Sequence, residues 1–289
     1  MWCVEKHLNV VNLPGIPTPG QLFKNPILLI QNPMIAELAE AFKRSVEQCL
    51  EDRIAISFSG GLDSTLIAQV AKANAEVTLF TAGMQGSDDM EVSIQVAEKL
   101  GLTLIAHTFS EQEVLDLYAK CFSLVPADLM KVELLIPVHR VAEMAKVRGF
   151  DALLFGSGAE ELFAGYDRYF DYRKEGKDVD TILKDEFSTL KDRELLMIKK
   201  VCRKFSIDAR FPFYSHRLAD LAFQIPLEDK MAERELKKCV LREVGKLLGA
   251  PEIALNRKKR AMQYGSGVHK VIMKHSEELN AKFPGKKND

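Results

Sequence analysis

The sequence predicts an α/β protein with a mostly parallel sheet and helices on both faces, followed by a helical C-terminal subdomain. In the first half, short apolar segments alternate with longer segments of helical periodicity, and beyond residue 170 we find only helical patterns. Strands that alternate with helices at this spacing imply right-handed crossovers between parallel strands. The 289 residues provide ample material for a core, as one large domain or two small ones.

The elements follow from these patterns in chain order. Five prolines and two glycines in residues 11–33 predict an irregular lead-in, and Asn32 and Pro33 predict the start of the first helix. We expect strands at 54–58, 77–80, 102–107 and 152–155. We expect helices at 34–50, 62–73, 89–100, 111–122, 137–148, 181–205, 215–224 and 233–248. The expected units are therefore a lead-in over 1–33, an α/β core over 34–170 and a helical part of the same domain over 171–289.

Composition excludes several classes of function. The 40 basic and 41 acidic residues nearly cancel, so a global basic field for nucleic acid is absent. Five scattered cysteines without a CxxC pair argue against a disulfide framework or a zinc site. No apolar run approaches the ~20 residues that span a bilayer, and the first residues lack the order of a signal peptide. We expect a cytoplasmic protein that does not enter a membrane.

The strongest motif is Ser59-Gly60-Gly61-Leu62-Asp63-Ser64, between a predicted strand and a predicted helix. Two glycines allow a tight turn whose amides can point into one concavity, next to the positive end of the helix dipole. Ser59 and Ser64 add hydroxyl donors. A carboxylate does not favour a phosphate directly, so Asp63 is expected to hold Mg²⁺ that bridges to the phosphate. The spacing is not that of a Walker A motif, and the alternative is a plain strand-to-helix turn.

This loop resembles the signature of the N-type ATP pyrophosphatases, which implies an adenine nucleotide alpha-hydrolase-like fold and release of pyrophosphate from ATP. Within that group, residues 153–169 resemble the Ser-Gly-Glu-Gly-Ala/Ser-Asp-Glu-Leu-Phe-Gly-Gly-Tyr signature of the asparagine synthetases. The segments 83–89, 208–218, 241–243 and 257–259 agree with the same family in order and spacing. The resemblance extends over residues ~34–270 and implies an AMP-forming carbon–nitrogen ligase.

The resemblance also implies residue roles. The nucleotide would contact the loop residues Ser59, Gly60, Gly61, Asp63 and Ser64 and the strand-end residues Ser57, Ala82, Phe155 and Gly156. Asp63 and Glu160 would hold Mg²⁺, and Lys259 would stabilise charge on the α-phosphate. For Arg257 to Arg260 the alternative is a solvated basic run, in which Lys259 alone has the family's position.

The chain departs from the asparagine synthetases at several positions. Trp2 stands where their glutaminase half has its nucleophilic cysteine, and only ~50 residues precede the first expected strand. We therefore expect nitrogen from ammonia, from an amine or from a separate glutaminase subunit. Ser157 replaces a glutamate near the reacting centre, and Ser215 replaces an aspartate. Glu133 stands where one group has an arginine that grips aspartate, which suits a less acidic or cationic carboxylate substrate.

Three functions remain open at this point. The first is a ligase that joins a small carboxylate to ammonia or an amine, with Glu133, Ser157 and Asp89 as substrate-binding candidates and asparagine as one candidate product. The second is an RNA-modifying ATP pyrophosphatase, suggested by basic residues between Lys237 and Lys274, although acids are interspersed there. The third is a non-catalytic nucleotide-binding regulator. A homodimer is compatible with each of them.

Overall fold

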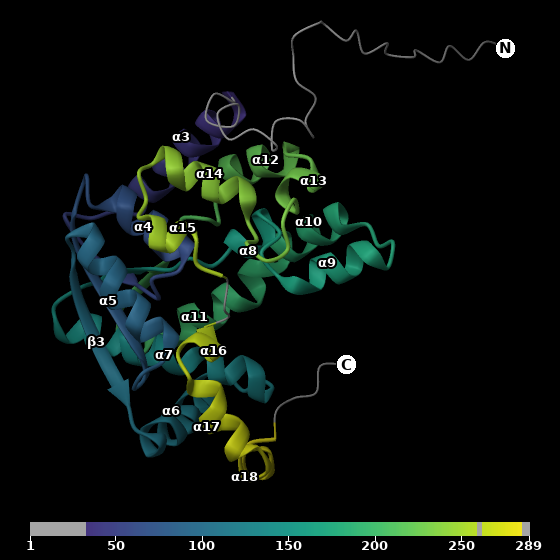
Figure 1. The fold of residues 1–289 in the computed structure, drawn as a ribbon. Helices are drawn as coiled ribbons and strands as arrows, with labels where there is room; N and C mark the ends of the chain where they lie inside the picture. The colour runs from purple at the N-terminus through teal and green to yellow at the C-terminus, as the bar shows by residue number, and fades with distance from the viewer. Residues whose placement is uncertain (1–32, 259–261, 285–289) are drawn as a thin grey trace, which may run out of the picture.

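The computed structural model describes residues 33–258 and 262–284 (Figure 1). Five parallel strands form one sheet in the order β3-β2-β1-β4-β5. Their bounds are β1 (Arg53–Ser57), β2 (Glu76–Met84), β3 (Thr103–Phe109), β4 (Ala152–Leu154) and β5 (Asp208–Arg210). Helices cover both faces, which confirms the predicted fold class. Lys259 and nearly all of the lead-in lie outside the described residues.

Nine helices, counted within the described residues, precede β5 and are joined by one 3-10 turn, η1 (Leu190–Asp192). Two of them, α8 and α9, follow β4 directly and carry the acidic segment that the sequence singled out. The helices are α3 (Pro33–Glu47), α4 (Leu62–Ala71), α5 (Asp88–Leu100), α6 (Glu111–Leu124), α7 (Leu129–Val147), α8 (Ala159–Leu162), α9 (Asp167–Lys174), α10 (Val179–Thr189) and α11 (Glu194–Arg203).

The helices after β5 are mostly short, and they pack on helices of the α/β part, namely α12 and α14 on α3 and α17 on α6 and α7. In Figure 1, α12 to α15 lie at one end of the molecule and α16 to α18 at the other. They are α12 (His216–Gln224), α13 (Leu227–Lys230), α14 (Cys239–Leu247), α15 (Glu252–Leu255), α16 (Met262–Gly265), α17 (Val268–Lys274) and α18 (Ser276–Lys282).

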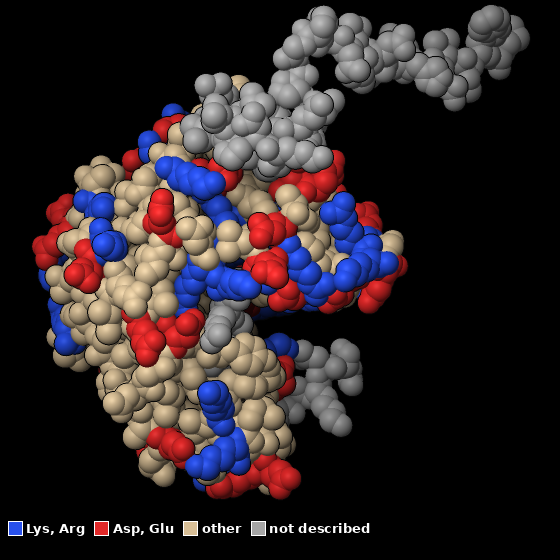
Figure 2. All heavy atoms as spheres, viewed as in Figure 1, with Lys and Arg blue, Asp and Glu red and all other residues tan. Residues whose placement is uncertain are grey.

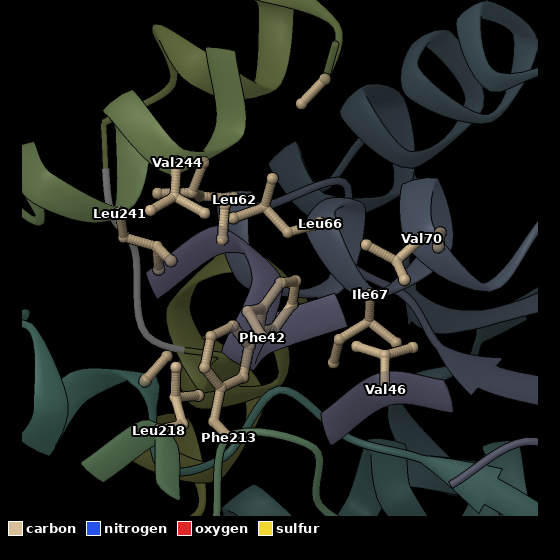
Figure 3. Packing of buried hydrophobic residues seen from close by; sticks show 14 of the residues in the cluster. Phe42, Val46, Leu62, Leu66, Ile67, Val70, Phe213, Leu218, Leu241 and Val244 are labelled. Carbon is tan, nitrogen blue, oxygen red and sulfur yellow. The ribbon is translucent and has the colours of Figure 1, made fainter. Parts of the chain in front are cut away.

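Strand residues alternate between two apolar layers, as the period of two along a strand requires. Ile54 and Ile56 pack into the layer under α3, α4 and α14, whereas Ala55 packs into the layer under α7 and α11. Figure 3 shows how side chains from α3, α4, α14 and the segment after β5 meet in the first layer around Phe42. Its ring stacks on Phe213 at 4.8 Å between centroids.

Four expectations about single elements were wrong. The helix expected over 233–248 begins only at Cys239, because Lys238 before it has a left-handed φ of +62°. The strands do not end at residue 170, because β5 adds to β4 with Leu153 paired to Ala209. The helix expected from Pro137 begins eight residues earlier at Leu129, where Asp128 caps it by accepting a hydrogen bond from the Lys131 amide at 3.0 Å. The long helix expected over 181–205 is instead α10, η1 and α11.

Among the described residues, every helix is too short or too polar to cross a membrane.

Candidate active site

A cavity of about 370 Å³ opens at the carboxyl ends of β1, β2 and β4. Ligands of parallel α/β sheets bind at this edge, because loops and helix N-termini converge there. Ser57, Ala82 and Phe155 line the cavity at the three strand ends. Residues of α9, α11 and α16 line its other side, and Figure 2 shows that the surface is hollowed between α9 and α17.

The phosphate loop between β1 and α4 is held by its own serines. Ser64 Oγ accepts a hydrogen bond from the Ser59 amide at 3.4 Å and donates one to the Gly61 carbonyl at 3.3 Å. The Gly61 amide in turn donates to Ser59 Oγ at 3.3 Å. These contacts fix the turn at the N-terminus of α4, where amides and the helix dipole favour an anion.

Gly60 is required in this loop for two reasons. Its φ of +66° lies in the left-handed region, which side chains with a Cβ avoid. A Cβ there would also lie 2.8 Å from the Val92 carbonyl carbon of α5. The loop therefore packs directly on the backbone of α5, and a larger residue would displace it.

Asp63 and Glu160, the two expected magnesium ligands, meet at one lysine. Lys238 Nζ lies 2.7 Å from both carboxylate oxygens of Asp63 and 2.8 Å from Glu160 Oε1. The Lys238 side chain is 3% exposed, so this is a buried cluster of two acids and one base. The two carboxylates thus face a common position that already holds positive charge.

The backbone around this cluster is specialised to bring the three charges together. Lys238 has a φ of +62° at the residue before α14, an unusual conformation for a residue with a side chain. Gly165 lies against the cluster, and a Cβ there would overlap both the Glu160 carboxylate and the Lys238 side chain. No sequence pattern indicates Lys238, because it stands in an ordinary basic pair 175 residues from Asp63.

Arg257 ties the phosphate loop to α5. Its Nη1 donates to the Ser59 carbonyl at 2.6 Å, and its Nη2 donates to Asp88 at 2.6 Å and to Asp89 at 2.7 Å. Within the expected basic run this residue is therefore partly buried and bonded, not solvated. Asp89 lines the cavity while it holds this arginine.

The remaining expected site residues fall into two groups. Ser157 and Gly156 line the cavity directly after β4, close to Asp63. Glu133 does not line it: this buried carboxylate accepts hydrogen bonds from His269 Nδ1 at 3.0 and 3.1 Å. Its pKa is raised by burial, although the contact with His269 opposes the rise. Glu133 thus has a partner inside the protein.

A smaller cavity of about 60 Å³ lies on the other side of the phosphate loop and shares Ser59, Gly61, Asp63 and Asp89 with the first. It is strongly basic. The cationic residues that line it are Lys237, Lys238, Arg242, Arg257 and Lys258.

The family model described as asparagine synthase matches residues 37–196 and 173–283. The chain belongs to the asparagine synthase family. A protein of Methanocaldococcus jannaschii described as a glutamine-hydrolysing asparagine synthetase is 31% identical over 82% of this chain and 50% of its own length. Asparagine synthetase B of Escherichia coli is 26% identical over 80% of this chain and 45% of its own length. This member of the asparagine synthase family thus spans about half the length of the curated relatives that it matches.

Solved structures with a related arrangement include a U34-tRNA thiolase of Methanococcus maripaludis, at TM-score 0.42 and 13% identity, covering 86% of this chain and 75% of the other. An NMN synthetase of Francisella tularensis also has a TM-score of 0.42, at 12% identity, covering 92% of this chain and 98% of the other.

Proposed function

We propose that the chain is an ATP-dependent, AMP-forming amide ligase. A carboxylate substrate attacks the α-phosphorus of ATP, and pyrophosphate leaves. Ammonia or an amine then attacks the acyl-adenylate, and AMP leaves. Aspartate is one candidate substrate and asparagine one candidate product, in line with the names of the relatives.

The observation that carries this proposal is the position of Asp63 and Glu160. They come from the phosphate loop and from α8, yet both contact the Lys238 ammonium at the edge of one cavity. Two carboxylates beside an anion-binding loop are what a metal-bound triphosphate requires, because the metal must bridge acid and phosphate oxygens. Neither a plain turn nor a structural helix cap needs a second acid at this position.

The donor set fits Mg²⁺. Among the described residues, no three metal-binding side chains of the His, Cys, Asp and Glu types come together. Mg²⁺ is commonly held by one or two carboxylates plus substrate phosphates and water, so Asp63 and Glu160 suffice. When bound, the metal would neutralise phosphate charge; the Lys238 ammonium already shows that the position accepts a cation.

The chain's own residues account for the other requirements of the reaction. The loop amides of 59–64 would hold the β- and γ-phosphates, and the strand ends at Ser57, Ala82 and Phe155 would hold the adenosine. The basic cavity on the far side of the loop offers cations to the departing pyrophosphate. Lys259, one residue after Lys258, remains our candidate for charge stabilisation at the α-phosphate.

The nitrogen donor and the assembly belong to the same proposal. Ammonia, an amine or a separate glutaminase subunit would supply the nitrogen, and a homodimer and a cytoplasmic location are further parts of it. Each is open to direct measurement once turnover is found.

The test is the release of AMP and pyrophosphate from Mg·ATP with ammonia and a panel of carboxylic acids. We expect acid-dependent AMP in the wild type and at least about a hundredfold less in Asp63→Asn, as loss of a transition-state electrostatic contact costs that much. Glu98→Gln, which alters an exposed carboxylate on α5, is the matched control and should retain activity.

Other products would redirect the proposal. Formation of ADP would overturn it. AMP release that requires tRNA and not a small acid would favour an RNA-modifying enzyme. Tight binding of ATP without turnover under any condition would favour a nucleotide-binding regulator.

A further inference from the structure

The end of the main cavity away from the phosphate loop is acidic. Glu161 of α8 and Glu194, the first residue of α11, line it together with Tyr166 and Arg168. Over the whole cavity, the described lining residues include five acids and one base, Arg168. The acids are Asp63, Asp89, Glu160, Glu161 and Glu194.

The charges near the loop are compensated from within the protein. Lys238 binds Asp63 and Glu160, and Arg257 binds Asp89. At the other end, Arg168 already has an ion-pair partner inside the protein. Its guanidinium lies 2.6 Å from the Glu186 carboxylate and 4.0 Å over the Tyr166 ring. The single base of the lining therefore compensates an acid outside the lining, and Glu161 and Glu194 have none to pair with.

The burial of the Glu161 carboxylate is the strongest indication that this end of the cavity binds a ligand. The residue is 3% exposed and lines the cavity. Within residues 33–258 and 262–284, no other residue donates a hydrogen bond to its carboxylate or forms an ion pair with it. Its own backbone amide is the donor that it has, so the carboxylate is left without a counter-charge from the described residues, and a buried charge is rarely kept without one.

Glu194 provides a second, less buried acid on a different element. It begins α11, a helix of ten residues, and the helix dipole favours a negative charge there. In the part of the chain that the structure describes, its carboxylate has no hydrogen-bond or ion-pair partner either. Two carboxylates without a counter-charge from the described residues therefore line the same cavity from α8 and α11.

We propose that this end of the cavity binds the cationic group, a protonated amine or a guanidinium, of the carboxylate substrate. The proposal rests on the proposed function, because the carboxylate end of that substrate has to face the nucleotide while the cation lies between Glu161 and Glu194. A ligand cation completes the charge balance that the protein leaves open. A dicarboxylate such as aspartate would place its distant carboxylate against two acids, unless an ammonium group took that end.

The experiment measures binding to the full chain by calorimetry, with Mg²⁺ and a non-hydrolysable ATP analogue present. The probes are γ-guanidinobutyrate, γ-aminobutyrate, the neutral isostere γ-ureidobutyrate and the dianion glutarate. We expect the two cationic probes to bind and the other two to bind at least about tenfold more weakly, as an unpaired buried charge requires. Comparison of the guanidinium probe with the ammonium probe shows which of the two cationic groups the site prefers.

The variants Glu161→Gln and Glu194→Gln preserve shape and remove charge. Each should weaken the cationic probes about tenfold or more while the ATP analogue binds as before, and Glu98→Gln should change neither. Binding of the ATP analogue also shows that each variant is folded. Equal affinity for the guanidino and ureido probes, tighter binding of glutarate, no binding of any probe, or unchanged affinity in both variants would overturn the inference. AMP formation is measured separately, so failure of the proposed function remains distinguishable.

Discussion

The Lys238 ammonium lies 2.7 Å from both carboxylate oxygens of Asp63, across 175 residues of sequence. It ties the helix α14, near the C-terminus, to the phosphate loop that follows the first strand. The same ammonium contacts Glu160, so one buried base balances two acids. Without a metal or nucleotide, this lysine is therefore the cation that allows the two expected magnesium ligands to lie close together.

Replacing Lys238 by methionine should reduce stability strongly. Removing one partner of a buried charge cluster leaves the other uncompensated, at a cost of about 3–5 kcal/mol. Urea unfolding measures the loss, and added Mg²⁺ should restore part of it, because the metal can occupy the position between the carboxylates. The exposed lysine of the Lys246–Glu243 pair is the control, where Lys246→Met should change stability by less than about 1 kcal/mol. Equal effects of the two variants would contradict the role of Lys238.

Gly60→Ala should damage the phosphate loop more than an alanine at a comparable glycine elsewhere. Both Gly60 and Gly101 have left-handed φ values, +66° and +68°, so both substitutions carry a backbone cost of about 1–2 kcal/mol. Only the Cβ at residue 60 would also meet backbone, at 2.8 Å, while that at residue 101 meets nothing within 4 Å. We expect loss of affinity for an ATP analogue only in Gly60→Ala. A similar loss in Gly101→Ala would show that general destabilisation is responsible.

The sequence was sufficient for the parallel sheet and the position of the loop, because both follow from local signals. Four strands are apolar runs, and the loop has a defined motif between a strand and a helix. The fifth strand escaped prediction because Asp208–Arg210 is only three residues long, with a charged residue at each end. Its strand character comes from pairing with β4, which is a tertiary contact.

Site residues that belong to a sequence motif could be predicted. Residues that tertiary packing brings to the site could not. Ser57, Ala82 and Gly156, which the resemblance assigned to the nucleotide, all line the cavity, because they lie at or near the carboxyl ends of β1, β2 and β4. Lys238, directly before α14, and Arg257, two residues after α15, reach the loop from distant parts of the sequence, and no spacing marks them. The arginine could have been suspected only as a member of the basic run. For Glu133, sequence position could not reveal that His269 binds its carboxylate.

Arg257→Gln should weaken binding of an ATP analogue, because the arginine fixes the Ser59 carbonyl and two aspartates of α5 at once. Loss of such charged hydrogen bonds costs about 1.5–3 kcal/mol, or roughly ten- to hundredfold in affinity. Lys43→Gln, at an exposed pair with Glu40 on α3, serves as the control and should lose less than about fivefold. The measurement is titration with the analogue at constant Mg²⁺. An equal loss for Lys43→Gln would show that the effect is not specific to Arg257.

The last prediction concerns pH. Burial raises the pKa of Glu161 from its ordinary value of 4.5 to about 8, and Glu194 and Glu160 add to the rise. Between these pH values the folded chain keeps a proton that the unfolded chain has lost, so this group makes stability fall as pH rises, by at most about 1.4 kcal/mol per pH unit. The charged or titratable groups around it are Glu160, Tyr166, Arg168, Glu186, Glu194 and Lys238.

Glu161→Gln tests this directly, because glutamine has nearly the same shape and does not titrate. The free energy of urea unfolding would be measured for both proteins from pH 5 to pH 8. Other groups contribute to both curves, so the difference between them isolates Glu161. The variant should gain stability relative to the wild type as pH rises through this window, since its buried amide loses no proton. A difference that is independent of pH would mean that Glu161 is already ionised at pH 5.

The same pH window applies to ligand binding. Below about pH 8 a bound cation should release a proton from Glu161, and the heat of binding should then depend on the ionisation enthalpy of the buffer.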